Sequence, residues 1–432
     1  MGEARSELIG LELEMAAVDP ATGRAAPYAG PRGVRRILEH VLEADSGTPV
    51  FDEDVLVAVR RRDGSVIALE PSSALEYSSA PCRGLTGLMA QAGSELRRLA
   101  DVAGRLGIAL VPGGNYPFND ISSVNWTPNR RIQIMSDYFS SVGDQGLWGP
   151  HVMGLTVSTQ ATFDFLSAAD LGRKLQMLVT VSPVATALFV NSPLENGRPT
   201  GLRSSRMRYW SKHSPGRSGV LPPALRPEFS LDAFVEWAAA LPMIYRKKGR
   251  GYAPAPARPF HEVLRHGFGD GTMPTWTDWE MHLSQIWTDV RLRRTLEARA
   301  CDGPPAEHVG SLPAFWTGLV YDPASCRAAW ELTRGHGVED YKRTMLDIAH
   351  RGLGADFLGA PVREIAGELV RLAREGLSRR VADDLESPSV LRHLDPLEEI
   401  LSTGETWADR CVRRWEGEFR HRPDQFVKAY QL

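Results

Sequence analysis

Two carboxylates stand two residues apart in a short apolar segment near the start of the chain. Glu12 and Glu14 alternate with Leu11, Leu13 and Met15, so the pattern predicts a strand with the acids on one face and the apolar side chains on the other. Two ionised groups at this spacing repel each other, and neither stands beside a basic residue. A divalent cation such as Mg²⁺ or Mn²⁺ would compensate their charge. The alternative is an exposed edge strand with solvated acids.

Three more glutamates, Glu70, Glu76 and Glu297, interrupt apolar segments of the same kind. One metal rarely needs five carboxylates, whereas two or three metals that bridge nucleotide phosphates would use them all. The sequence has no GxxxxGK[ST] motif and no GxGxxG after a strand, so metals and arginines would have to hold the phosphates. Arg299, on the same strand face as Glu297, is placed to do so. The alternative is an ion pair between these two residues within the sheet.

Arginines in apolar or aromatic company form a second group. Arg131 precedes three apolar residues, and Arg206 and Trp210 lie in a segment rich in serine and arginine. A forked guanidinium suits a substrate carboxylate or a transferring phosphoryl group. The alternative is a surface arginine that packs its stem on an aromatic ring. His282, close to Trp279, is interpreted as a packing residue of a helix.

The elements that would position these residues alternate between short strands and amphipathic helices. We expect strands at 10–15, 66–69, 75–77, 155–165 and 290–299, helices at 85–106 and 171–179, and loops at 249–259 and 303–310. The last strand would place Arg291, Glu297 and Arg299 on one face. The pattern predicts an α+β protein whose antiparallel sheet is covered by helices on one face and meets ligand on the other. We expect one domain over residues 1–432.

Composition limits the classes of partner. A formal net charge of -3 and a pI near 6.4 give no reason to expect nucleic acid. The N-terminus lacks an apolar signal region and no apolar run approaches membrane-spanning length, so we expect no membrane partner. Four cysteines without C-x-x-C spacing are typical of reduced thiols in a cytoplasmic protein. The absence of a GxSxG elbow disfavours a serine hydrolase. The oligomeric state is left open.

An ordered series of motifs resembles one known family. The series is GLELE at 10–14, LEP at 69–71, LEYS at 75–78, TVSTQ at 156–160, ALFVNSP at 187–193, LEARACD at 296–302 and LPAFWTGLVYD at 312–322. It is similar to the plant-type and actinobacterial glutamate–cysteine ligases, from about Gly10 to Phe419. The resemblance implies a funnel-shaped antiparallel sheet related to glutamine synthetase and the guanido kinases. It also implies that ATP phosphorylates the γ-carboxylate of glutamate before an amine displaces phosphate.

The resemblance also implies a role for each matching position. The metal ligands would be Glu12, Glu14, Glu70, Glu76, Gln160 and Glu297. Arg299, with Arg291 on the same face, would bind the nucleotide phosphates. Arg131 and Arg206 would hold the glutamate end and the γ-phosphoryl group, so Arg206 and Arg299 are the predicted catalytic residues. Trp210, Arg217 and Ile244 complete the predicted substrate-binding set.

Several positions depart from the family pattern. Where the family has EPGGQ this chain has EPSSA at 70–74, and its Gln-x-Asn is Gln160-Ala161-Thr162. Arg131 is followed by isoleucine, and the family's Pro-Met-Tyr, whose tyrosine lines the cysteine pocket, ends here in Ile244. ATP activation is therefore the firmer prediction. Three functional hypotheses stay open: a glutamate–cysteine ligase, a ligase for another amine in specialised metabolism, and a phosphagen-kinase-like phosphotransferase.

Overall fold

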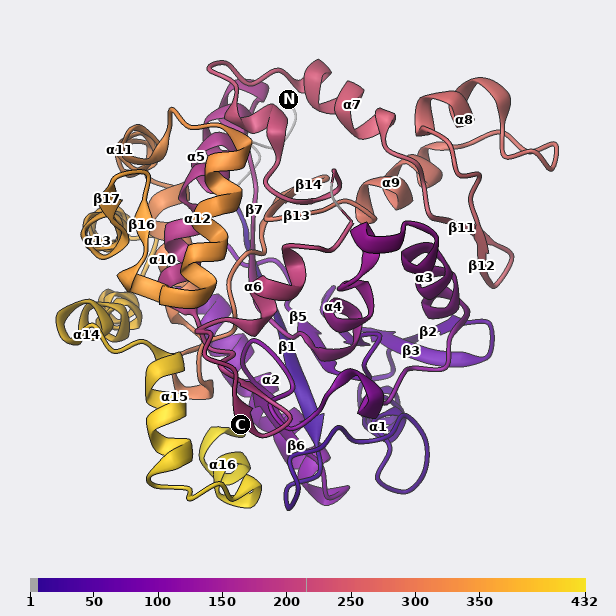
Figure 1. Cartoon of the computed structure of the whole chain (residues 1–432), viewed down its shortest axis with the longest axis horizontal. Coiled ribbons are helices and arrows are strands. Elements are labelled where there is room, and N and C mark those ends of the chain that lie inside the picture. The colour runs from indigo at the N-terminus through magenta and orange to yellow at the C-terminus, as the bar shows by residue number, and fades with distance from the viewer. Residues whose placement is uncertain (1–6, 215) are drawn as a thin grey trace.

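A nine-stranded antiparallel sheet runs through the centre of the computed structural model, which describes residues 7–214 and 216–432. Its strand order is β14-β15-β7-β1-β5-β4-β3-β2, and β6 pairs with the second half of β1 (Figure 1). The strands are β1 (Ile9–Val18), β2 (Thr48–Asp52), β3 (Val55–Arg60), β4 (Val66–Leu69), β5 (Leu75–Ser78), β6 (Ala109–Pro112), β7 (Thr159–Phe163), β14 (Val290–Leu292) and β15 (Leu296–Ala298).

β1 is an interior strand of this sheet, which excludes the exposed-edge alternative for its two acids. On one side it pairs with β5, where Glu14 lies opposite Glu76. On the other side it pairs with β7, where Glu12 lies opposite Gln160. Because side chains alternate between the two faces of a strand, the acids of neighbouring strands share one face.

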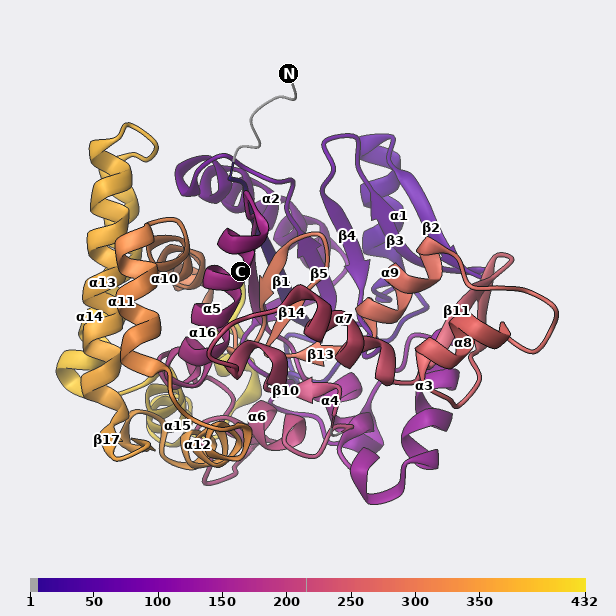
Figure 2. The same cartoon turned by 90° about the horizontal axis from the view of Figure 1, so that it is seen from above.

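Helices cover the apolar face. Leu11, Leu13 and Ile9 are fully buried in one core cluster together with residues of α1 (Arg35–Asp45), α2 (Leu85–Arg105), α5 (Ala168–Phe189), α10 (Ser311–Val320) and α13 (Val362–Ala382). Figure 2 shows α13 and α14 (Asp395–Thr403) on one side of the sheet and the hairpin of β11 (Tyr245–Lys248) and β12 (Gly251–Pro254) on the other. The expected α+β fold, with helices on an antiparallel sheet, is confirmed.

The remaining elements surround this framework. The other helices are α3 (Arg130–Ser141), α4 (Gly149–Leu155), α6 (Ser205–Trp210), α7 (Leu231–Ala240), α8 (Phe260–His266), α9 (Trp276–Ser284), α11 (Pro323–Thr333), α12 (Val338–Arg351), α15 (Trp407–Glu416) and α16 (Pro423–Tyr430). The short strand pairs are β8 (Leu194–Glu195) with β9 (Arg198–Pro199), β10 (Ser218–Gly219) with β13 (Trp287–Thr288), and β16 (Asp356–Phe357) with β17 (Ala360–Pro361). Among residues 7–214 and 216–432, no helix combines the length and apolar composition needed to cross a membrane.

Four expected boundaries were wrong. The segment 290–299 is a hairpin, not one strand, because a turn that begins at Arg293 joins β14 to β15. In 155–165 the strand starts only at Thr159, because Leu155 still belongs to α4. The loop expected at 249–259 contains β12. The helix expected at 171–179 runs on to Phe189, and Pro183 lies within it. The helix at 85–106 is confirmed to within one residue.

The crossing of α10 and α13 supplies a test of the packing. A Cβ on Gly318 would lie 2.1 Å from the backbone oxygen of Ala373, so the two helix backbones can touch only because this residue is glycine. We expect Gly318→Ala to lower the free energy of unfolding by about 2 kcal/mol, since the helices must separate. Urea unfolding measures the change.

Gly367 is the matched control, because it lies in α13 and a Cβ there would meet nothing within 4 Å. Gly367→Ala should raise the stability by up to about 1 kcal/mol through helix propensity. Equal effects of the two substitutions would contradict the close crossing.

Candidate active site

The polar face of the sheet borders a cavity of about 300 Å³. Carboxylates occupy one part of its wall and guanidinium groups another, while methionine and aromatic side chains line the rest. The predicted site residues that line it are Glu12, Glu14, Glu70, Glu76, Gln160, Arg131, Arg206, Trp210, Arg291 and Arg299. These ten residues are spread over almost 300 positions of the sequence, and the fold brings them to one cavity.

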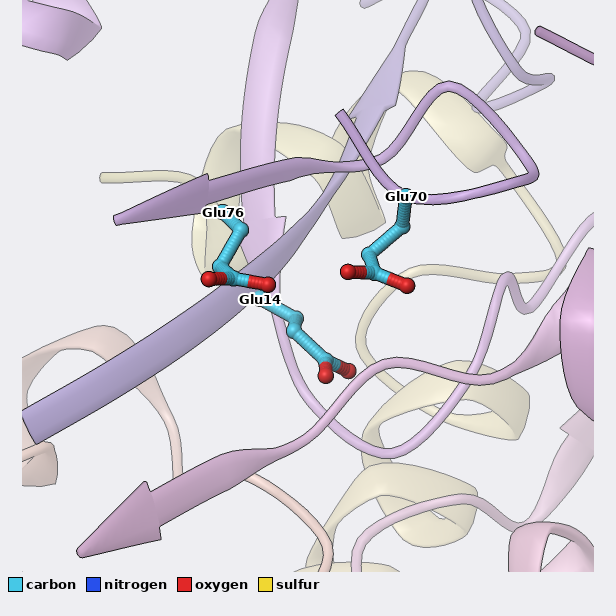
Figure 3. A group of neighbouring side chains, drawn as sticks. All are labelled: Glu14, Glu70 and Glu76. Carbon is cyan, nitrogen blue, oxygen red and sulfur yellow. The ribbon is translucent and has the colours of Figure 1, made fainter. Parts of the chain in front are cut away.

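Three of the acids converge closely enough to share a cation. Glu14 comes from β1, Glu76 from β5, and Glu70 from the turn between β4 and β5; Figure 3 shows their carboxylates pointing toward one another. One oxygen of each lies within 4.8 Å of the others. Hard carboxylate oxygens in this arrangement fit Mg²⁺ or Mn²⁺, which prefer such ligands.

Gln160 links this trio to a second charged group. Its amide nitrogen donates to Glu14 Oε1 over 2.9 Å, and its carbonyl oxygen accepts from Arg299 Nη1 over 2.7 Å. Arg299 also donates to Glu297 Oε1 over 2.6 Å, and Arg291 holds both oxygens of Glu297 at 2.7 and 2.9 Å. The ion pair between Arg299 and Glu297 that the sequence left as an alternative is present. Glu297 is buried beneath these arginines, outside the cavity lining that the described residues form.

The pKa values of the acids shift in opposite directions: those of Glu12 and the trio rise, and that of Glu297 falls. Burial, with the neighbouring Glu76, raises the pKa of Glu14 to about 7. Burial and adjacent carboxylates also raise the pKa of Glu12, Glu70 and Glu76. Burial acts on the pKa of Glu297 in the same direction, but Arg291, Arg299 and Arg293 together lower it well below its usual range. Nearby arginines offset this rise in pKa only in part for Glu14 and Glu70, whereas three arginines reverse it for Glu297.

A larger chamber of about 500 Å³ opens beside the first. The two share Arg206, Trp210, His213, Trp287 and Arg299 as a common wall. The walls of the larger chamber are mainly apolar, with contributions from α6, α12 and the strands β10 and β13. One chamber is thus lined by acids and arginines and the other mainly by apolar side chains, with Arg206 and Arg299 in the wall between them.

Arg206 and Arg299 both belong to the wall that the two chambers share. Arg206 donates from Nη1 to the carbonyl oxygen of Ala300 over 2.7 Å and from Nη2 to that of Arg299 over 2.9 Å. Its guanidinium lies 5.7 Å from the ring centre of Trp210. These contacts fix the guanidinium at the common wall; its phosphoryl-binding role stays a prediction.

Two residues of the predicted substrate-binding set lie elsewhere. Of the residues that the structure describes, the lining of the 300 Å³ cavity includes neither Arg217 nor Ile244. Arg217 is buried behind it and donates to the backbone oxygens of Pro242 and Gln285. Ile244 packs in an apolar cluster. Sequence position alone could not separate a residue that lines the cavity from one that supports it.

Tyr245 lines the cavity where the family pattern led us to expect residue 244. This chain therefore presents a tyrosine to the cavity after all, one residue later in the sequence than the family pattern has it. Ala74, another departure, is fully buried in the core. His213, Trp287 and Met153 also line the cavity, and no motif marked them. His282 is buried in α9 with its ring centre 5.6 Å from that of Trp279, so its expected packing role is confirmed.

Fold and site together define an enzyme of the ATP-dependent carboxylate–amine ligase class. The model of glutamate–cysteine ligase family 2 matches residues 8–425. The chloroplastic glutamate–cysteine ligase of Nicotiana tabacum is 31% identical over 415 residues, which are 95% of this chain and 77% of that protein. The chloroplastic glutamate–cysteine ligase B of Oryza sativa subsp. japonica is 31% identical over 418 residues, covering 96% and 82%. This chain therefore belongs to glutamate–cysteine ligase family 2.

Solved structures share the fold. The glutamate–cysteine ligase of Francisella tularensis, in complex with AMP, superposes with a TM-score of 0.57 at 13% identity, over 98% of this chain and 86% of that one. The bifunctional glutathione synthetase of Pasteurella multocida gives 0.54 at 14% identity, over 98% and 52%. At such identities the likeness concerns architecture alone.

The raised pKa of Glu14 predicts a pH-dependent stability. Its protonated form is favoured in the folded protein, so its contribution is complete below pH 4.5 and is lost as pH rises toward about 7. In EDTA, the free energy of unfolding of the wild type minus that of Glu14→Gln should fall over this range, by up to about 1.4 kcal/mol per pH unit. Urea unfolding at successive pH values measures it.

Mn²⁺ should flatten this difference, because a bound cation holds the carboxylate ionised. A difference that is constant with pH in EDTA would contradict the raised pKa of Glu14.

Proposed function

We propose that this protein is an ATP- and Mg²⁺-dependent ligase that joins the γ-carboxyl group of glutamate to an amine. The observation that carries the proposal is the continuous polar network from the Glu14, Glu70 and Glu76 trio through Gln160 to Arg299 and Glu297. Phosphoryl transfer depends on charge neutralisation and alignment more than on covalent help from the protein. This network offers both within one buried site.

Glu14, Glu70 and Glu76, with Glu12 and Gln160 beside them on the cavity wall, would hold two or three Mg²⁺ or Mn²⁺ ions. Glu297, which the family pattern also assigns to the metals, is held instead by arginines outside the lining that the described residues form. Once bound, such ions supply positive charge that the phosphate oxygens and the substrate carboxylate need. Glu297 keeps Arg291 and Arg299 oriented toward the cavity through the ion pairs described above. Arg299 would then contact the nucleotide phosphates.

The chemistry takes two steps. A γ-carboxylate oxygen of glutamate attacks the γ-phosphorus of ATP, and ADP leaves. The amine nitrogen then attacks the carbonyl carbon of the acyl phosphate, phosphate leaves, and the nitrogen loses a proton. Arg206 and Arg131 would orient the glutamate and the phosphoryl group. The apolar wall that includes Met153, Trp210 and Trp287 would limit access of water to the acyl phosphate.

Cysteine is the acceptor that we propose. The relatives above are glutamate–cysteine ligases, and two departures that favoured another amine, Ala74 and Ile244, lie outside the lining that the described residues give the cavity. Another amine in specialised metabolism is the second candidate, because the Arg131–Ile132 pair, which does line the cavity, differs from the family pattern. A cytoplasmic location stays a prediction.

Release of phosphate from ATP tests the reaction. With Mg²⁺, ATP, glutamate and a panel of amines, we expect phosphate release that depends on glutamate and is fastest with cysteine. Mass spectrometry of the product should show one new amide bond. A product from a different amine and none from cysteine would reject cysteine. A stable phosphorylated product without free phosphate would identify a phosphotransferase instead.

Glu297→Ala should reduce kcat at least about 1000-fold, because it removes a buried charge on which Arg291 and Arg299 depend. Glu280→Ala is the control, since Glu280 forms an ion pair with the exposed Arg294 outside the cavity. Glu280→Ala should keep wild-type kcat. Full activity of Glu297→Ala would refute the assigned network.

A further inference from the structure

Asp302 is a fully buried carboxylate next to the site, and it does not belong to the lining of either chamber as the described residues define them. It follows β15 by four residues. Oδ2 accepts from the backbone N–H of Asn191 over 2.8 Å and from the hydroxyl of Ser192 over 2.7 Å. Oδ1 accepts from the hydroxyl of Ser204 over 3.0 Å. Three neutral donors surround this buried acid, so its hydrogen bonds tie together segments of the protein itself.

The two serines carry this contact to α6, the helix that holds Arg206. Ser204 is the N-cap of α6 and accepts from the N–H of Met207 over 3.1 Å. Ser192 accepts from the N–H of Arg206 over 3.3 Å. Asp302 therefore fixes the start of α6 through both hydroxyl groups.

The guanidinium of Arg206 links α6 back to the segment that follows β15. It donates to the carbonyl oxygens of Arg299 and Ala300, on the strand end that leads to Asp302. The result is a closed ring of contacts from Asp302 through Ser204 and α6 to Arg206 and back through the backbone of Arg299. Each of the two predicted catalytic arginines is held by this ring, one by its side chain and one by its backbone.

The surroundings leave Asp302 little freedom. A Cβ on Gly114 would lie 2.5 Å from Asp302 Cγ and 2.8 Å from Ser192 Cβ. The backbone of Gly114 thus packs directly against the carboxylate. A residue held so tightly on both sides can define the position of its partners to a fraction of an ångström, which is the tolerance that catalysis requires.

We propose that Asp302 is a positioning residue that aligns Arg206 and Arg299 for phosphoryl transfer, through Ser192 and Ser204. The inference rests on the proposed function, since it needs an activity that depends on Arg206. A carboxylate is suited to the task because it only accepts hydrogen bonds, and the three groups around it can all donate. Asparagine has a single acceptor oxygen, so Asp302→Asn preserves the shape but forces one hydroxyl to turn.

The test compares kcat of Asp302→Asn with that of the wild type in the phosphate-release assay, per folded protein as judged by circular dichroism. We expect kcat to fall about 30-fold or more while KM for ATP and glutamate changes less than about threefold, because alignment matters in the transition state. In an Arg206→Lys background the same change should cost less than about threefold, since the aligned group is already altered.

Asp322→Asn is the matched control for a loss of a buried acid, because Asp322 is buried, caps α11 and lies outside the linings that the described residues give both chambers. It should lower stability but not kcat. Ser204→Ala and Ser204→Thr provide a second pair that decides the matter if Asp302→Asn does not fold. The alanine variant should lose about tenfold in kcat, and the threonine variant, which keeps the hydroxyl, should regain most of it.

Equal loss from Asp302→Asn in the wild-type and Arg206→Lys backgrounds would overturn the proposal, as would wild-type kcat in Asp302→Asn or in Ser204→Ala. These outcomes differ from failure of the proposed function, in which the wild type itself releases no phosphate with any amine.

Discussion

The structure depends on the cost of burying several like charges on one face of a sheet. Glu12, Glu14, Glu70 and Glu76 stand close together, half-buried on one cavity wall, and the loss of solvation raises the pKa of each. A fold tolerates this only if something positive compensates the charge. Arginines do so for Glu297, whereas the trio of Glu14, Glu70 and Glu76 has the oxygen donors of a divalent cation site. The clustered acids lower the stability of the protein without ligand, and under the proposed function bound cations would offset this cost.

The sheet makes this concentration of charge possible. Paired strands bring residues into one row, so that Glu14 faces Glu76 and Glu297 faces Arg291 across neighbouring strands. The apolar face of the same strands packs on α2, α5 and α10. Rigid strands hold the charged side chains better than loops would. The positioning of α6 by Asp302 extends the same principle to a helix outside the sheet.

Two departures from the family pattern concern residues that do not line the cavity in the part of the chain that the structure describes. Ala74 and Ile244 differ from the pattern but are buried in two separate apolar clusters, while Tyr245, next to Ile244 in sequence, borders the cavity. Ser73 adopts a left-handed conformation, φ 63°, in the turn that carries Glu70. The family has glycine in this stretch, and glycine takes that conformation without strain. The acid is still presented correctly, because the turn hydrogen bonds from Ser73 to Glu70 and from Glu70 to Ala74 are made.

The α+β class and the strands at Glu12, Glu14 and Glu76 could be predicted from the sequence, because strict alternation reports which side chains share a face. Tertiary structure alone decided that 290–299 is a hairpin and that α5 continues through Pro183, since packing overrides local signals. It also decided that Arg217 and Ile244 stand behind the cavity while His213, Trp287 and Tyr245 face it. Contacts between distant segments decide whether a side chain faces the cavity or supports its wall. The order of residues along the chain does not specify these contacts.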